Sequence, residues 1–125
     1  MIYLDVEDVL MIHLEQITNY GGDAAIRDHG LLESAIAQPQ ATFGGQLLHE
    51  SVAQAAAAYL FHLAKNHPFV DGNKRTALAS MLVFLTINGH DIRWEPDEAA
   101  TITEGVASGT VSKEALTEAV AAAIL

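Results

Sequence analysis

The sequence contains no cysteine, so neither a disulfide framework nor a thiolate metal site can form. Cations are also scarce, since only six Lys and Arg residues stand against sixteen Asp and Glu, which gives a formal net charge of −10. A surface that binds nucleic acid normally carries many cations, and this composition therefore argues against a DNA or RNA partner. Any anion that the protein binds must be held at one place by a few side chains.

No hydrophobic run is long enough to cross a membrane. The two most apolar stretches, residues 52–64 and 77–87, fall short of the roughly 20 residues that a bilayer requires. The first ten residues, MIYLDVEDVL, are acidic where a secretory signal peptide would be basic. We therefore expect a cytoplasmic protein. Its 125 residues, half of them apolar, are enough for one domain, residues 1–125, with a hydrophobic core of its own.

Hydrophobic residues recur at helical spacing along most of the chain and predict an all-α bundle. The segment from residue 73 to 88 is apolar on nearly all sides, which is typical of a buried helix at the centre of a fold. An irregular stretch is expected from Pro39 to Gln46, and a short extended piece over residues 90–95. The expected helices cover residues 5–20, 29–37, 52–66 and 73–88, followed by one that starts near Pro96 and a last one capped by Ser112.

One polar stretch, NHPFVDGNKRTA at residues 66–77, lies between two apolar helical segments and contains two of the six cations. Asn73 falls at the start of the predicted central helix, where backbone N–H groups lack partners and the helix dipole favours anions. Gly72 permits a sharp turn and a close approach of the backbone to a ligand, and Lys74 and Arg75 add full positive charge. These features suit a phosphate group.

Two further side chains in this stretch carry chemistry. Asp71 suits Mg²⁺, which prefers one or two carboxylates together with the phosphate oxygens of a nucleotide. His67 is placed to take the proton from an incoming hydroxyl, a role that is typically worth about 10²–10⁴ in rate. Each residue alone also has an ordinary explanation as a loop residue, a helix cap or a solvated first turn. Their joint occurrence makes a phosphate-binding enzyme loop as good an explanation as an ordinary connection.

The stretch HPFVDGNKR resembles the signature loop of the Fic superfamily, whose pattern is His-x-Phe-x-(Asp/Glu)-Gly-Asn-(Gly/Lys)-Arg. NKRTAL, followed by an apolar helix and Asn-Gly, resembles the death-on-curing (Doc) branch, the toxins of bacterial toxin–antitoxin pairs. The likeness extends to the segments NYGG, IRDHGLLESAIAQPQATFGG and ASGTVS, and so covers essentially the whole chain. It implies a compact Fic-like helical bundle with a central buried helix.

The resemblance implies a role for each residue of the loop. His67 would be the general base that activates a hydroxyl of a protein substrate, Asp71 would hold Mg²⁺ with the nucleotide phosphates, and Phe69 would anchor the loop in the core. The phosphates of ATP would be cradled by the residues at the start of the following helix, Gly72, Asn73, Lys74 and Arg75. The family is known for transferring the terminal phosphate of ATP to a threonine of elongation factor Tu, which halts translation.

Two positions depart from the Fic enzymes that transfer AMP, which carry Gly in place of Lys74 and a second Arg in place of Leu78. Losing that Arg removes a charge-assisted phosphate contact of about 1.5–3 kcal/mol, and Lys74 adds a charge nearer the turn. A triphosphate bound in a different direction would present a different phosphorus to the hydroxyl, which favours a kinase. AMP transfer is the enzymatic alternative, and a non-catalytic binding module with the same fold is the other.

Three other features bear on the site. His62 and His67 are five residues apart, which is a poor spacing for a metal pair on one helix face. His13 lies on an apolar helix face, so we expect a core histidine. The segment Pro39–Gln46 is a candidate for the flap that aligns the target peptide in Fic proteins, near the site, with Phe43 partly exposed. The alternative is a glycine loop with Phe43 in the core.

The resemblance also implies how such a toxin is restrained. Members of the family are neutralised by a small antitoxin whose disordered tail folds against the toxin. Some Fic proteins instead carry an inhibitory helix with Ser or Thr four residues before Glu-Gly. Glu104-Gly105 is present here, but Ala100 stands at the fourth position before Glu104. We therefore expect inhibition by a separate, Phd-like antitoxin.

Overall fold

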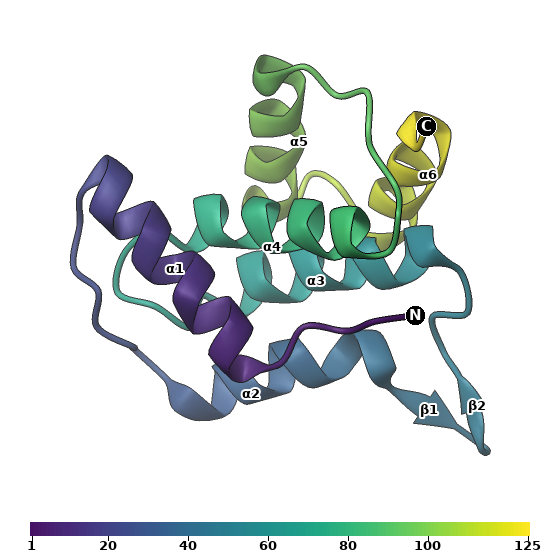
Figure 1. Ribbon diagram of the computed structural model, residues 1–125, viewed down its shortest axis with the longest axis horizontal. Helices are drawn as coiled ribbons and strands as arrows, with labels where there is room; N and C mark the ends of the chain where they lie inside the picture. The colour runs from purple at the N-terminus through teal and green to yellow at the C-terminus, as the bar shows by residue number, and fades with distance from the viewer.

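The computed structural model describes all residues, 1–125, and consists of six α-helices and one small hairpin (Figure 1). The prediction of an all-α bundle is confirmed. None of the helices is both long and apolar enough to cross a membrane. The elements, in chain order, are α1 (Val6–Tyr20), α2 (His29–Ala37), the 3₁₀ turn η1 (Gln38–Gln40), β1 (Thr42–Phe43), β2 (Gln46–Leu47), α3 (Val52–Asn66), α4 (Asn73–Ile87), α5 (Pro96–Ser108) and α6 (Lys113–Ala123).

Polar side chains fix most of the helix starts, close to where the sequence predicts them. The side chains of Asp5, Ser51 and Ser112 each accept a hydrogen bond from the backbone N–H three residues on, at 2.8, 3.1 and 3.0 Å. Each such cap is worth about 1 kcal/mol. Helix α5 begins with Pro96, a favoured first-turn residue. Helix α4 has no side-chain cap, so no side chain accepts a hydrogen bond from the N–H groups of its first turn.

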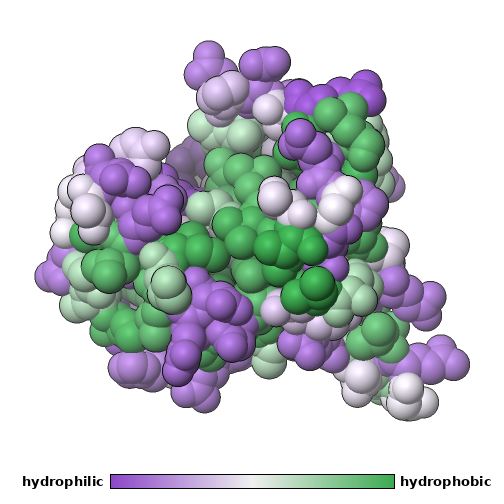
Figure 2. Space-filling view, in the orientation of Figure 1, coloured by the Kyte–Doolittle hydropathy of each residue, from purple (hydrophilic) through white to green (hydrophobic).

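Helix α3 is the hub of the fold, because it packs against α2, α4, α5 and α6. Its alanines at residues 55–58 are fully buried and let the neighbouring helices approach closely. Helix α4 lies beside α3 in the middle of the molecule (Figure 1). The buried helix expected at residues 73–88 is α4, but α3 is the more completely buried of the two. Val83 and Ile87 of α4 are 37% and 40% exposed, and both line a mainly hydrophobic hollow with residues of the N-terminal segment and α1. Figure 2 shows hydrophobic surface in the middle of this face.

The stretch from Pro39 to Gln46 is more regular than predicted. Strands β1 and β2 pair antiparallel, with Thr42 opposite Leu47. Gly44 and Gly45 connect them with φ of 60° and 80°, and two positive φ angles are the requirement of the tight turn that suits a hairpin. A Gly-Gly pair between two short runs was the signal for this hairpin in the sequence.

The segment between α4 and α5 is extended, as predicted, and it is tied to the end of α6. Ile92 forms an antiparallel bridge with Ile124, and the N–H of Arg93 donates to the carbonyl of Ala123 at 3.0 Å. Helix α5 then returns to pack against α4. This return brings Glu104 close to the first turn of α4.

Candidate active site

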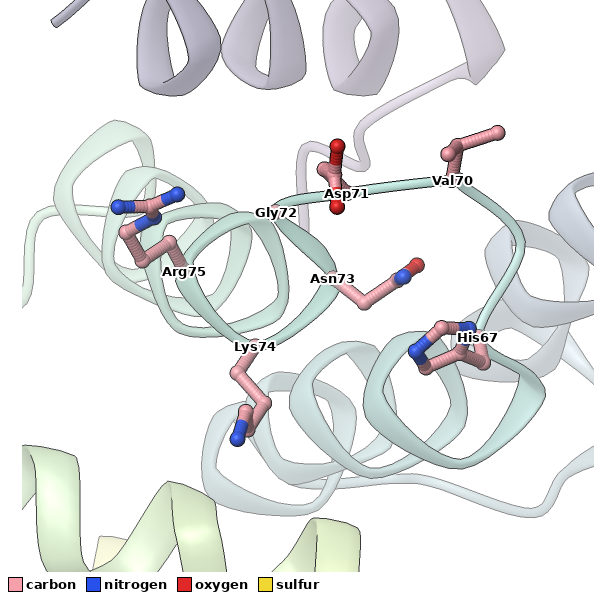
Figure 3. Close-up of a pocket in the computed structure, with 7 residues that line it drawn as sticks. All are labelled: His67, Val70, Asp71, Gly72, Asn73, Lys74 and Arg75. Atoms are coloured by element: carbon pink, nitrogen blue, oxygen red, sulfur yellow. The ribbon is translucent and has the colours of Figure 1, made fainter. Parts of the chain in front are cut away.

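A cleft of about 370 Å³ opens where α3 ends and α4 begins (Figure 3). All six residues that the sequence predicts for the site line it, and the only other lining residue is Val70. The lining residues are His67, Val70, Asp71, Gly72, Asn73, Lys74 and Arg75. The fold therefore brings the predicted residues together, and their chemical roles stay predictions.

His67 follows the last residue of α3 in the left-handed conformation, with φ of 51° and ψ of 55°. It is the only residue other than glycine with a positive φ in the protein. For a residue that carries a Cβ, this conformation costs on the order of 1–2 kcal/mol. The side chain is exposed and stands at the rim of the cleft (Figure 3). A strained backbone at the candidate base indicates that the surroundings enforce its position.

A neighbouring segment, residues 25–28, runs alongside the loop and supports it. Arg27 donates from Nε to the carbonyl of His67 at 2.7 Å and from Nη2 to the carbonyl of Asn66 at 2.9 Å. Its backbone N–H donates to the carbonyl of Pro68 at 2.7 Å. Sequence reasoning assigned no role to Arg27. Its only sequence signal is that it is one of six cations and stands directly before the cap of α2.

The floor of the loop is Phe69, which is fully buried. The ring of His13 stacks on it with centroids 3.6 Å apart and planes 6° apart. His13 Nε2 also lies 2.8 Å from the carbonyl oxygen of Asp71. The prediction of a core histidine is confirmed, since only 2% of His13 is exposed, and the same residue fixes the backbone of Asp71.

Asn73 closes the loop on itself. Its Oδ1 accepts a hydrogen bond from the N–H of Phe69 at 2.9 Å, and its Nδ2 donates to the carbonyl of Phe69 at 2.8 Å. The side chain is turned to the inside of the loop (Figure 3), and the residue is 5% exposed. Asn73 was predicted as a phosphate ligand, but both polar atoms of its side chain are hydrogen-bonded to the backbone of the loop. Any contact with a phosphate would therefore come from its backbone N–H.

The first turn of α4 provides an anion site made of backbone. The N–H groups of Asn73, Lys74 and Arg75 find no acceptor within the protein. Gly72, with φ of 79°, starts the helix, and a Cβ at this position would lie 3.2 Å from Ile17 Cδ1. Free N–H groups at a helix N-terminus, together with the helix dipole, favour binding of a phosphate.

The two cations of the cleft are held by different elements. Lys74 Nζ lies 2.7 Å from Glu104 Oε2 on α5. The guanidinium of Arg75 lies over the ring of Tyr20 at 5.0 Å from its centroid. Because the side chains of Lys74 and Glu104 are 53% and 62% exposed, their ion pair is worth no more than about 1 kcal/mol. A triphosphate can therefore compete with Glu104 for Lys74.

Asp71 presents a carboxylate at the cleft. Its Oδ2 accepts a hydrogen bond from the N–H of Asp23 at 2.7 Å, while its Oδ1 has no partner in the protein. One oriented carboxylate next to a phosphate site fits the ligand preference of Mg²⁺, which takes most of its ligands from phosphate oxygens and water. No group of three or more His, Cys, Asp or Glu side chains that could hold a metal occurs in the structure.

His62 lies outside the cleft and contacts α6. Its Nε2 is 2.9 Å from Lys113 Nζ. Burial, together with the charges of Lys113 and His49, lowers the pKa of His62 to about 4. The nearby His49 is 7% exposed, and burial lowers its pKa as well. These three residues form a half-buried basic cluster that is separate from the candidate site.

The hairpin does not lie beside the cleft. Phe43 is 80% exposed, so the alternative of a core position is wrong. However, the hairpin precedes the first residue of α3, whereas His67 follows its last, and the 15 residues of α3 span about 22 Å (Figure 1). No hairpin residue lines the cleft. The expectation that this segment lies near the site is therefore wrong, because α2 and α3 carry it to the opposite end of the molecule.

Comparison with known proteins links this site to a family. The model of the family described as Fic/DOC matches residues 3–85, which include the whole cleft. The chain is 44% identical over 108 residues to "Toxin Doc" of Mycolicibacterium smegmatis (strain ATCC 700084 / mc(2)155), covering 85% of this chain and 81% of that protein. It is 35% identical over 112 residues to "Protein kinase doc" of Escherichia phage P1, covering 90% of this chain and 87% of that protein.

Proposed function

Because this chain belongs to the Fic/DOC family, we propose that it is a Doc toxin that transfers the terminal phosphate of ATP to a hydroxyl of a protein. The observation that carries the proposal is the cleft itself. It combines an exposed imidazole, His67, with the uncapped N-terminus of α4 and the cations Lys74 and Arg75. A base beside an anion site is the arrangement that phosphoryl transfer requires.

The residues of the cleft divide the task between them. The backbone N–H groups of residues 73–75 and the two cations bind the phosphates, and Asp71 would hold Mg²⁺ at this site. Mg²⁺, when bound, neutralises charge on the phosphate oxygens. His67 orients the acceptor hydroxyl and accepts its proton. The hydroxyl oxygen forms a bond to the terminal phosphorus, the bond from that phosphorus to the β-phosphate oxygen breaks, and ADP leaves.

The position of Leu78 favours transfer of the terminal phosphate over transfer of AMP. Leu78 lies one turn after Lys74 and Arg75 on the same side of α4, and these three residues line one hollow together with Ala100, Thr103 and Glu104 of α5. Position 78 therefore adds no cation to the two in the first turn of α4, Lys74 and Arg75. An enzyme that presents the α-phosphorus has a second Arg at the position of Leu78, as the family resemblance implies.

Labelled ATP tests the proposal directly. The protein is incubated with a bacterial translation extract and with ATP labelled either at the γ or at the α phosphorus. Label from the γ position alone should reach a protein, and elongation factor Tu is the expected acceptor, at a threonine. Label from the α position would establish the AMP transferase instead. Absence of both labels, with growth arrest equal for wild type and His67→Ala, would favour a non-catalytic binding module.

A toxin of this kind is proposed to act in the bacterial cytoplasm with a Phd-like antitoxin as its partner. A groove beside the cleft offers a place for the antitoxin tail, because it is open and partly apolar (Figure 2). An amphipathic helix fits such a surface. The groove runs along α4 and is lined by Gln16, Tyr20, Arg75, Leu78, Ala79 and Leu82. Placing a larger uncharged polar side chain there, as in Ala79→Gln, should weaken neutralisation and leave phosphate transfer unchanged.

A further inference from the structure

Arg27 holds the piece of backbone that carries the proposed base. Its guanidinium and its own N–H donate to three consecutive carbonyls, those of Asn66, His67 and Pro68, at 2.9, 2.7 and 2.7 Å. We propose that Arg27 is a positioning residue that fixes the His67 imidazole for proton transfer, an inference that rests on the proposed function of His67. Arg27 does not line the cleft, so it acts through the backbone rather than on the nucleotide.

The end of α3 needs such a support. The position occupied by His67 is usually taken by glycine, since it requires a left-handed backbone. A side chain at this position is strained, and the last carbonyls of a helix lack partners and carry partial negative charge. The Arg27 guanidinium satisfies two of these carbonyls and places a positive charge beside them. It therefore stabilises the strained conformation seen at His67.

The direction of the His67 side chain follows from this conformation. The φ and ψ angles of a residue fix the direction of its Cα–Cβ bond, so a return to ordinary helical or extended angles would swing the imidazole away from the start of α4. The rest of the cleft has its own supports, which are the Asn73 side chain on Phe69 and the His13 ring on Asp71. Loss of Arg27 should therefore displace the base and leave the phosphate site in place.

Loss of the Arg27 side chain should lower the rate of phosphate transfer without weakening ATP binding. Arg27→Met removes both side-chain hydrogen bonds but keeps the backbone N–H bond to Pro68. We expect kcat for phosphate transfer to fall by about 10–100-fold, the cost of misplacing a catalytic group by about 1 Å, while the Kd of ATP changes by less than about twofold. Arg27→Lys, which reaches one carbonyl at most, should retain an intermediate kcat. Arg93→Met is the matched control, because Arg93 is exposed and its side chain bonds to nothing in the protein.

The imidazole signals of His67 in proton–carbon correlation spectra provide a readout that does not need turnover. In Arg27→Met they should shift while those of the buried His13 stay, which shows a displaced base in a folded protein. Equal kcat for wild type and Arg27→Met with unmoved His67 signals would overturn the inference, as would parallel losses of kcat and ATP affinity or an equal loss in Arg93→Met. If the wild type binds ATP but transfers no phosphate, the proposed function fails, and the shift of the His67 signals still decides the positioning role.

Discussion

The double hydrogen bond of Asn73 gives a sharp test of what this residue does. Asn73→Ala leaves the N–H and the carbonyl of Phe69 without partners in a fully buried place. An unsatisfied buried backbone group costs about 1–3 kcal/mol, so the two together should lower the free energy of unfolding by about 2–6 kcal/mol. For a chain of 125 residues, 1 kcal/mol corresponds to about 4 °C in Tm. Thermal unfolding followed by circular dichroism should therefore show a Tm lower by about 8–24 °C.

A control variant shows whether the Asn73 side chain stabilises the loop or binds a phosphate. Asn66→Ala removes one half-buried hydrogen bond, to the carbonyl of Leu31 at 2.9 Å, and should cost about 1 kcal/mol, or about 4 °C. Calorimetry with ATP and Mg²⁺ is then carried out on each folded variant at low temperature. An Asn73→Ala protein that melts within about 2 °C of the wild type but binds ATP tenfold more weakly would refute the reasoning, because the side chain would then be a phosphate ligand.

Three further predictions follow from the same geometry. Glu104→Gln frees Lys74 from an exposed ion pair that is worth no more than about 1 kcal/mol. Calorimetry at low salt should therefore show ATP binding up to about fivefold tighter. The control Glu98→Gln removes a carboxylate that forms no ion pair and should leave ATP affinity unchanged. Lys74→Gly combined with Leu78→Arg restores the cation pattern of AMP-transferring enzymes and should shift transfer from the γ to the α label; unchanged γ transfer would remove the explanation based on these two positions. Burial lowers the pKa of His62 in the folded protein to about 4, below the ordinary histidine value of 6.5, so the unfolded chain takes up the proton first. The free energy of unfolding should therefore decrease as the pH falls from about 6.5 to about 4, by about 1–2 kcal/mol for a half-buried group. Urea titrations at several pH values should show that the free energy of unfolding depends less steeply on pH in His62→Gln than in the wild type. The pH dependence should be unchanged in the exposed variant His29→Gln.

Local signals explain how far the sequence predicted this fold. The caps at Asp5, Ser51 and Ser112 and the glycines after the helices are read from neighbouring residues, so the helix bounds agree with the structure to within one or two residues. The residues that line the candidate cleft were predictable for the same reason, since residues 67–75 are the connection between α3 and α4 and the first turn of α4. What depends on tertiary packing was missed. The placement of the hairpin at the far end of α3 depends on the path of α2, which no local pattern contains.

The side chains that hold the loop in place also make contacts that the sequence did not predict. His13 was read correctly as a core residue from its apolar helix face, but its contact with Asp71 joins residues 58 positions apart. The contact of Arg27 with His67 joins residues 40 positions apart. Asn73 was assigned to phosphate because its position at a helix start suits an anion, while the competing bond to Phe69 became visible only once the loop was closed.

The separate origin of these supports has a consequence for catalysis. The proposed base, His67, is held from the segment before α2, through Arg27, whereas the carbonyl of Asp71 is held from α1, through His13. The phosphate side can also be perturbed from α5, through Glu104, without any contact to His67. A partner that displaces α5 or covers α4 would therefore change nucleotide binding before it changes the geometry of the base. In the complex with such a neutraliser, the KM for ATP should rise while kcat at saturating ATP stays constant.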